Sequence, residues 1–318
     1  MSDGLLKKAI LYDYPEKLPV SVSILPAAWI QNGAELERLL REYPDLYPDI
    51  PDWKNIRDEL PPTYRLGTHT DEWGCVWENV QEGMEAIVTG HPLPRREDIL
   101  RARMPKNRDG SLPHGFMYLR ILDLRGFEEA MVDFAEECGE IQTLIDLVAA
   151  YNCVQIDAAL THTGDIMAFG DDLGTQNGLL IGAEKWRRYF KPCFKRMYQK
   201  VRDAGKLVYM HTDGQIFEIM PDLAECGVNM INPQFRANGL DHLVRVCKGK
   251  IPINLDLDRQ LFPFAAPSQI DDHVRECVEA LYLPAGGLGL NIELNYDVPL
   301  ENVDAVLAAA RKYREYKG

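Results

Sequence analysis

The sequence contains no uninterrupted apolar run of the roughly 18 residues that a membrane-spanning helix needs. Its beginning also lacks the long apolar stretch and the small-residue cleavage site of a secretory signal peptide. Positive charge is scarce, since 35 lysines and arginines stand against 49 aspartates and glutamates, for a net charge of −14. Surfaces that bind phosphate backbones or anionic membranes need clustered cations, so we expect no nucleic acid and no membrane among the partners.

The cysteines give no sign of a disulfide framework or of a cysteine metal site. The chain has seven of them, an odd number, and no two stand in a CxxC spacing. We therefore expect free thiols that mostly fill the core, in a cytoplasmic protein.

Glycine-rich phosphate loops of the types GxGxxG and GxxxxGK[ST] are also missing. Residues 1–115 are rich in proline and predict loops, short strands and insertions without long helices, around one early strand at 19–25. Residues 126–151 predict one or two helices, because apolar side chains recur there at helical spacing. From residue 165 onward, five short apolar runs are each followed by a helical segment. These pairs are 165–169 with 183–204, 206–210 with 216–226, 228–231 with 240–247, 251–255 with 269–281, and 287–292 with 300–316.

Five consecutive strand–helix units require right-handed crossovers and a parallel sheet. Because a doubly wound sheet usually carries a glycine-rich phosphate loop, its absence favours the α/β class with a single (β/α)₈ TIM barrel. We expect one domain over residues 1–318, in which 1–64 form an irregular N-terminal extension and the first strand.

Polar side chains follow all five apolar runs, at the strand ends where a barrel carries its chemistry. Two of them, Asp172 and Asp213, could instead cap the helices that follow. The full set comprises Asp171, Asp172, Gln176, His211, Asp213, Asn232, Gln234, Asp256, Asn291 and Glu293.

His211 and Asp213 stand two residues apart in a predicted strand, so their side chains should point the same way. With Glu293 from another strand they would supply three ligands and leave one position open, the arrangement of a catalytic zinc. A histidine at a strand end can also simply hydrogen-bond or orient a substrate, and both interpretations stay open.

The segment 185–202 carries eight lysines and arginines opposite an apolar face. The simpler interpretation is a solvated amphipathic helix, and the alternative is a docking face for an acidic partner.

Several stretches resemble one protein family in sequence, order and spacing. The clearest are GDDLGTQNGLLIGAEKWRRYFKP at 170–192 and AGKLVYMHTDGQIFEIMPDLAECGVNMINPQ at 204–234. Shorter ones are DEWGCVWE at 71–78, LRGFEEAMVDFAEE at 124–137 and VPLENVDAVLAA at 298–309. Over residues 65–316 the chain resembles the uroporphyrinogen decarboxylase superfamily, and most of all its cobalamin-dependent methyltransferase-like branch. The resemblance implies a (β/α)₈ barrel and either porphyrinogen decarboxylation or methyl transfer involving a corrinoid.

The chain departs from both activities of the family at informative positions. The decarboxylase has an arginine-rich loop of the type RQAGR near its N-terminus, whereas residues 24–36 here read ILPAAWIQNGAEL and no arginine precedes Arg38. The methyltransferase branch often has His-x-Cys where this chain has His211-Thr212-Asp213, and a cysteine near Asn291 and Glu293. A site of imidazole and carboxylate suits an oxygen-bearing substrate such as a methyl ether better than a thiolate-rich site does.

The hypothesis is a corrinoid-dependent methyltransferase that O-demethylates a small methyl donor such as a methoxylated aromatic. His211, Asp213 and Asp172 would be catalytic, with zinc on His211, Asp213 and Glu293. The corrinoid would come from a partner protein, since the chain lacks the DxHxxG motif of a cobalamin module. Alternatives are a metal-free carboxy-lyase for another carboxylated substrate and a non-catalytic corrinoid or porphyrin binder. Residues expected to orient the substrate or form an aromatic wall are Asp171, Gln176, Asn232, Gln234, Asn291, Trp29, Trp73 and Trp77.

Overall fold

The computed structural model describes residues 3–318, and the chain forms two compact units. The first unit comprises residues 1–67, 79–86 and 232–318, and the second comprises 68–78 and 87–231. None of the helices in the described part of the chain combines the length and apolar character that crossing a membrane requires.

Six strands form a sheet in the order β1-β9-β8-β7-β6-β5, and β7 (Met230–Pro233) runs from the second unit into the first. The pairings of β1 with β9, β8 with β9 and β5 with β6 are all parallel. The α/β fold on a parallel sheet is therefore confirmed, and closure into an eight-stranded barrel stays a prediction. Strands β2 (Gly67–Thr70), β3 (Val76–Asn79) and β4 (Ile87–Gly90) form a separate small sheet, antiparallel between β3 and β4.

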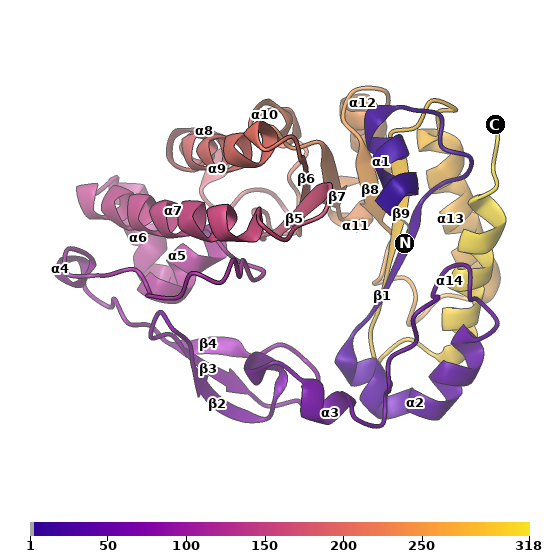
Figure 1. Cartoon of the computed structure of the whole chain (residues 1–318), viewed down its shortest axis with the longest axis horizontal. Helices are drawn as coiled ribbons and strands as arrows, with labels where there is room; N and C mark the ends of the chain where they lie inside the picture. The colour runs from indigo at the N-terminus through magenta and orange to yellow at the C-terminus, as the bar shows by residue number, and fades with distance from the viewer. Residues whose placement is uncertain (1–2) are drawn as a thin grey trace. The chain divides into compact units, whose positions relative to one another are not determined.

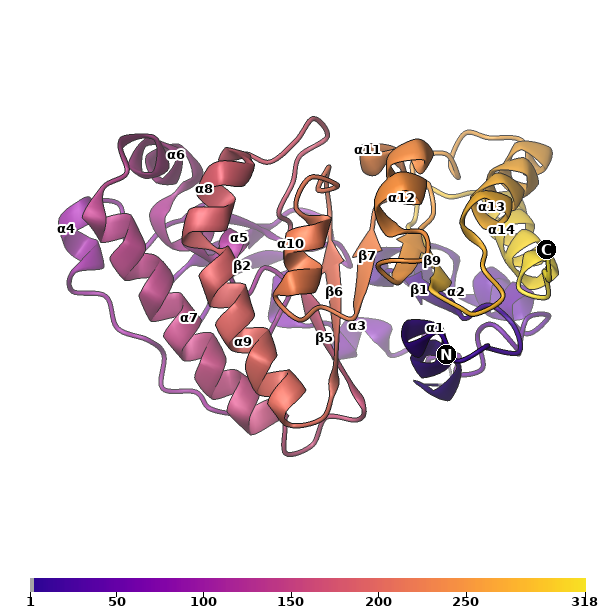
Figure 2. The ribbon, with the colours of Figure 1, turned by 90° about the horizontal axis from the view of Figure 1, so that it is seen from above.

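The helices of the second unit cover its two long parallel strands. In Figure 2, α7 and α9 lie side by side and α10 lies next to β6. Buried aromatic rings fill the space between helices and strands, and Phe169 of β5 lies 5.0 Å from Tyr198 of α9 between ring centroids. The elements are α4 (Arg96–Ile99), α5 (Tyr118–Arg125), α6 (Phe127–Glu136), α7 (Gly139–Ala159), β5 (Ile166–Gly170), α8 (Gly182–Tyr189), α9 (Lys191–Asp203), β6 (Leu207–Thr212) and α10 (Met220–Glu225).

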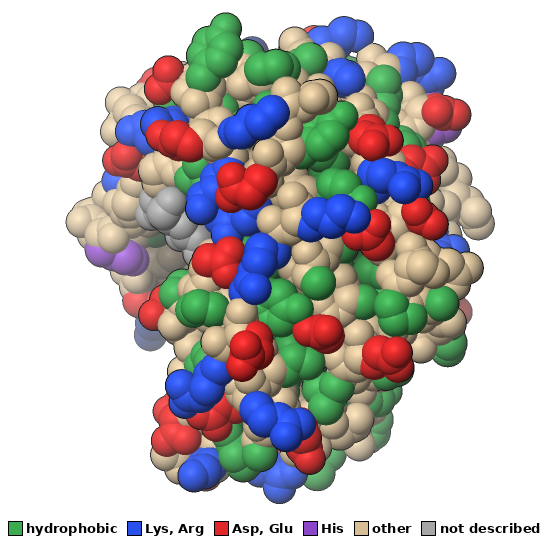
Figure 3. Space-filling view, turned by 90° about the vertical axis from the view of Figure 1, so that its right-hand side faces the viewer, with side chains coloured by type: hydrophobic (Ala, Val, Ile, Leu, Met, Phe, Trp, Pro, Cys, Tyr) green, Lys and Arg blue, Asp and Glu red, His purple; other side chains and the backbone are tan. Residues whose placement is uncertain are grey.

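In the first unit, α13 and α14 pack against each other, and α14 also contacts β9 and α2 (Figure 1). Over the side on which α13 and α14 lie, cationic and anionic side chains alternate among apolar ones (Figure 3). The elements are α1 (Asp3–Leu11), β1 (Val20–Ile24), α2 (Pro26–Leu40), α3 (Ile56–Glu59), the 3₁₀ turn η1 (Pro62–Tyr64), α11 (Phe235–Asn238), α12 (Leu240–Cys247), β8 (Ile253–Asp256), α13 (Pro267–Leu281), β9 (Leu288–Leu294) and α14 (Leu300–Tyr313).

One prediction for the N-terminal third is wrong, because α2 is a long helix of 15 residues. Its only proline is Pro26, at the first position of the helix, where a backbone N–H has no helical partner to lose. Residues 27–40 contain no proline, but they lie between proline-rich stretches, which is why the sequence did not indicate a helix here. The early strand predicted at 19–25 is confirmed as β1.

Candidate active site

The ends of β5 and β6 bring four polar side chains of the second unit together. Gly170 is opposite His211 in the parallel pairing of the two strands, and Asp172 follows two residues after Gly170. The imidazole of His211 and the carboxylate of Asp213 point to the same side, with Nε2 3.2 Å from Oδ1. Both side chains are partly open to solvent, which a site that receives a substrate requires.

The loops after β5 and β6 are hydrogen-bonded to each other. The Leu173 amide donates to the buried Thr212 hydroxyl at 3.1 Å, and the Asp213 amide donates to Asp172 Oδ1 at 3.3 Å. Gly214 has a positive φ of 84°, and a Cβ there would lie 2.1 Å from the carbonyl carbon of Gly174. Glycine is therefore required at this contact. The carboxylates of Asp172 and Asp213 are thus held by a rigid pair of loops.

His114 completes this group, and no periodic pattern in the sequence points to it. It lies in the irregular segment before α5, where the Gly115 amide donates to the Gly170 carbonyl at 2.9 Å. A Cβ at Gly170 would lie 2.7 Å from His114 Nδ1, so glycine allows the imidazole to approach β5. His114 Nε2 lies 3.1 Å from Asp172 Oδ1, and its ring centroid is 5.7 Å from that of His211. The result is two adjacent histidine–carboxylate pairs, His114 with Asp172 and His211 with Asp213.

The same group contains a candidate metal site. One ligand atom from each of His114, Asp172 and His211 lies within 4.8 Å of the other two. Two imidazoles and a carboxylate with an open fourth position are a donor set that catalytic zinc uses. These residues therefore fit zinc, and only His211 is shared with the predicted ligand set of His211, Asp213 and Glu293, which stays a prediction.

Asp171 has a structural role instead of facing this site. Its carboxylate is fully buried and accepts hydrogen bonds from the Tyr118 and Leu119 amides, the first two of α5. Burial raises the pKa of Asp171 to about 7, and the two amide hydrogen bonds oppose that rise. Asp171 therefore caps the helix that follows His114 and fixes where that segment enters α5.

The other predicted substrate contacts of the second unit lie farther along its loops. Gln176 is exposed in the turn that Thr175 and Gly178 close by a backbone hydrogen bond of 2.8 Å. Trp73 is half-buried and meets the Tyr151 ring edge-on, with centroids 5.0 Å apart. Trp77 donates its indole N–H to Asp71 Oδ2 at 3.0 Å. Their contact with a substrate stays a prediction.

The first unit has its own row of polar side chains on β1, β8 and β9. The Ser21 hydroxyl donates to Asn291 Oδ1 at 2.8 Å, and the Asn291 amide donates to Asp256 Oδ1 at 3.0 Å. Glu293 forms an ion pair with Arg259, a residue that the sequence analysis missed because it lies beyond the strand end. The role of Glu293 as a zinc ligand stays a prediction.

Three further predicted residues of the first unit take part in its packing. Asn232 is buried and donates to the Asn254 carbonyl at 2.5 Å. Gln234 precedes α11 and accepts from the Asn238 side chain through its carbonyl at 2.8 Å. Trp29 is only 1 % exposed within α2, so it belongs to the core and does not offer an open aromatic wall.

Comparison with solved structures shows a shared fold. A methyltransferase from Methanosarcina mazei matches with a TM-score of 0.69 and 17% identity, over 96% of this chain and 97% of that one. A dihydropteroate synthase from Xanthomonas albilineans in complex with 4-aminobenzoic acid matches only 43% of this chain and 52% of its own, with a TM-score of 0.28 and 17% identity. A comparison with curated proteins finds no match.

A family model covers more than half of the chain. The uroporphyrinogen decarboxylase (URO-D) model matches residues 121–313, which include β5, β6 and the strand ends that carry Asp172, His211 and Asp213. On this match, the chain belongs to the uroporphyrinogen decarboxylase family.

Proposed function

We propose that the protein is a methyltransferase that removes a methyl group from a small methoxylated compound and passes it to a corrinoid on a separate protein. The observation that carries the proposal is the pair of histidine–carboxylate contacts at the ends of β5 and β6. The fold shared with the Methanosarcina mazei methyltransferase supports the same reaction class.

The protein's own residues would stabilise the departing oxygen. An alkoxide or phenoxide leaves poorly, so a proton or a cation must reach the oxygen as the methyl group departs. Asp213 Oδ1 lies 3.2 Å from His211 Nε2, and Asp172 Oδ1 lies 3.1 Å from His114 Nε2. Either imidazole could hold a proton against its carboxylate and deliver it to the oxygen, while the methyl group passes to the cobalt of the partner's corrinoid.

His114, Asp172 and His211 would hold a zinc ion, and bound zinc would supply Lewis-acid polarisation of the same oxygen. Asp213 would then act as a hydrogen-bond partner that fixes the orientation of a zinc ligand. Compared with a thiolate-rich site, these harder donors favour an oxygen-bearing substrate.

The direct test is methyl transfer to free cob(I)alamin from a panel of methoxylated aromatics. We expect loss of cob(I)alamin absorbance and release of the matching phenol. His211→Ala and His114→Ala should each lower the rate by roughly 100-fold or more, because they remove the proton or cation donor. His162→Ala, an exposed histidine after α7, is the matched control and should keep full activity. Failure to demethylate any donor, or full activity in both variants, would overturn the proposal.

The family match favours a second candidate, a carboxy-lyase that acts without metal on a carboxylated compound. The same histidines would then protonate the carbanion that remains when CO₂ leaves. Release of CO₂ that chelators leave unchanged, without methyl transfer, would identify this activity.

A further inference from the structure

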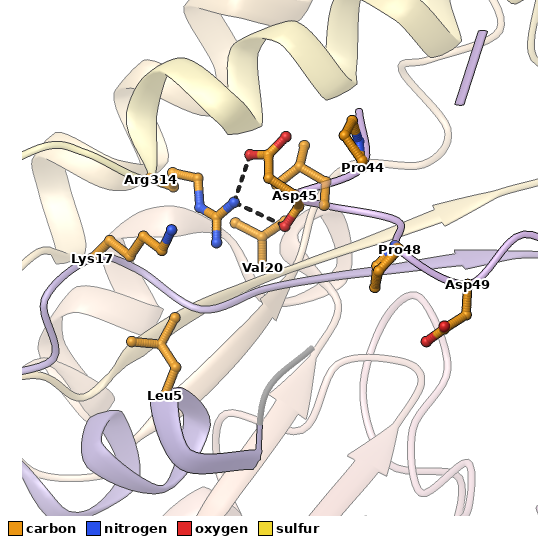
Figure 4. A pocket seen from close by; sticks show the side chains of 9 residues that line it. Leu5, Lys17, Val20, Pro44, Asp45, Pro48, Asp49 and Arg314 are labelled. Atoms are coloured by element: carbon orange, nitrogen blue, oxygen red, sulfur yellow. Dashed lines mark hydrogen bonds and ion pairs between the residues drawn. The ribbon is translucent and has the colours of Figure 1, made fainter. Parts of the chain in front are cut away.

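The first unit contains a cavity that neither the sequence motifs nor the proposed reaction uses. It has a volume of about 490 Å³, a size typical of small-molecule sites, and lies at the start of β1 (Figure 4). Leu5, Val20, Leu46 and Pro48 give it an apolar wall, and Lys17 and Arg314 bring two cations to it. All of these residues belong to one compact unit.

Arg314 lines this cavity, and only one nitrogen of its guanidinium group makes hydrogen bonds in the described part of the chain. Its side chain is only 7% exposed, and Nη1 donates to the Asp45 carbonyl at 3.0 Å and to Asp45 Oδ2 at 2.8 Å. Nε is buried without a hydrogen-bond partner, and Nη2 makes no hydrogen bond within residues 3–318. Nε and Nη2 form one edge of the guanidinium, the edge that can hold a carboxylate or phosphate through two parallel hydrogen bonds. Nε has almost no accessible surface, whereas Nη2 is not among the fully buried atoms, so Nη2 is the donor of this edge that an anion in the cavity could reach.

Lys17 brings a second positive charge to the same cavity. Figure 4 shows its ammonium on the side of Arg314 that faces away from Asp45. Lys17 is half-buried and makes no hydrogen bond or ion pair with any residue that the structure describes. The Leu18 amide donates to the Arg314 carbonyl at 2.9 Å, which ties the segment carrying Lys17 to the end of α14. Two cations thus line the same cavity, and Lys17 has no acidic partner among the described residues there.

Two acids, Asp45 and Asp49, line the cavity together with the two cations. Asp45 is shared, because Arg311 contacts Oδ1 at 3.0 Å while Arg314 contacts Oδ2 at 2.8 Å. One carboxylate therefore faces two guanidinium groups before Lys17 is counted. Asp49 lines the same cavity but is exposed to water, where its charge is screened. The charges of the four ionisable lining residues therefore balance, but Asp45 is already paired with Arg311 and Arg314, and Lys17 is the lining cation that has no ion pair within residues 3–318.

We propose that this cavity binds a small molecule with an anionic head group and an apolar body. The head group, a carboxylate or a phosphate, would accept from Nη2 of Arg314 and from the Lys17 ammonium. The body would lie against the Leu5, Val20 and Leu46 side chains. This ligand is distinct from the methyl donor, and its binding does not depend on the proposed reaction.

The test is calorimetric titration of the full chain with benzoate and, separately, with inorganic phosphate, in chloride buffer at constant ionic strength. We expect one molecule to bind per chain, and the anion that binds more tightly identifies the head group. Lys17→Met should weaken binding about tenfold or more, because a charge-assisted hydrogen bond is lost. Lys17→Arg should retain most of the affinity.

Control variants make either outcome decisive. Lys250→Met changes an exposed lysine of the same unit and should bind as the wild type does. Leu5→Trp should block the cavity and abolish binding while the circular dichroism spectrum stays native. His211→Ala should leave the affinity unchanged, since it lies in the other unit. The proposal is overturned if neither anion binds, or if Lys17→Met and Leu5→Trp both bind as tightly as the wild type.

Discussion

Two adjacent aspartates at the end of β5 have different roles, and their surroundings decide which. Asp171 points into the protein and accepts the first two amides of α5, whereas Asp172 is about one-third exposed and faces His114. Alternation along an extended chain sends neighbouring side chains to opposite sides. A helix cap and a site carboxylate can therefore stand next to each other in the sequence.

This difference predicts opposite phenotypes for two alanine substitutions. Asp171→Ala leaves two buried amide N–H groups without an acceptor and should lower the free energy of unfolding by about 1–3 kcal/mol. Asp172→Ala should change the free energy of unfolding by less than about 1 kcal/mol, because its side chain is partly solvated. It should nevertheless abolish high-affinity zinc binding and demethylation. Urea denaturation and a zinc titration of both variants separate these effects, and equal destabilisation by the two would contradict the assignment.

Gly170 is expected to control the position of His114. An alanine Cβ would lie 2.7 Å from His114 Nδ1, so Gly170→Ala should push the imidazole away from Asp172. We expect affinity for zinc to fall by about tenfold or more, since a misplaced ligand weakens a metal site. Gly139→Ala is the control, because nothing lies within 4 Å of a Cβ there. Unchanged zinc affinity in Gly170→Ala would remove His114 from the site.

The sequence predicted only part of this site, for a physical reason. His211 and Asp213 could be found because a strand places residues two apart on one side. His114 could not, because its place depends on the hydrogen bond between the Gly115 amide and the Gly170 carbonyl, 55 positions apart, in a segment without periodicity. The structural role of Asp171 was equally hidden, since its partners lie in a helix that precedes it by about 50 residues.

At the scale of elements, the cationic segment at 185–202 folds as two helices, α8 and α9, with Pro192 at the start of the second. Its predicted apolar face is buried, including Trp186, Phe194 and Met197. Several of its cations already pair with neighbouring acids, as Lys191 does with Asp222 at 2.6 Å. The simpler interpretation, an amphipathic helix with a solvated charged face, accounts for these contacts.

His273 on α13 predicts an acid-sensitive step in stability. Burial lowers the pKa of His273 to about 4, and its Nε2 accepts from the Asp258 amide at 3.0 Å, which requires a neutral ring. An unfolded histidine has a pKa of about 6.5. Between about pH 6.5 and about pH 4, His273 is protonated in the unfolded chain but stays neutral in the folded chain. The free energy of unfolding therefore decreases as the pH falls through this range.

The measurement is the free energy of unfolding of wild type and His273→Gln at neutral pH and near pH 4.5. The variant lacks the titrating ring, so its deficit relative to the wild type should shrink toward acid pH, by up to about 1.4 kcal/mol for each pH unit. His162→Gln, an exposed control, should run parallel to the wild type. A constant difference between wild type and His273→Gln would show that burial of this ring does not govern the acid response.

At the scale of the whole molecule, the repeated strand–helix pattern predicted the α/β class because each apolar run is buried between helices. All five predicted strands after residue 164 are present as β5 to β9, and every strand end lies within two residues of its predicted position. The sequence could not predict the division into two compact units, because residues 79–86 join the unit of residues 1–67 only through tertiary contacts. The backbone hydrogen bond from the Ala27 amide to the Gly83 carbonyl, at 3.1 Å, is one such contact.

The cysteines allow a last prediction that tests the packing of both units at once. All seven are free, and five are buried, in agreement with the expectation from their scattered positions. Burial raises the pKa of these five thiols, which keeps them protonated and unreactive at neutral pH. Only Cys138 and Cys153 are partly exposed.

An Ellman titration of the native protein should therefore modify about two thiols per chain, and all seven should react in guanidinium chloride. The variant carrying Cys138→Ser and Cys153→Ser is the control and should show almost no native reaction, since neither substitution opens the core. Rapid reaction of four or more thiols in the native wild type would mean that these helices and strands open far more often than tightly packed cores do.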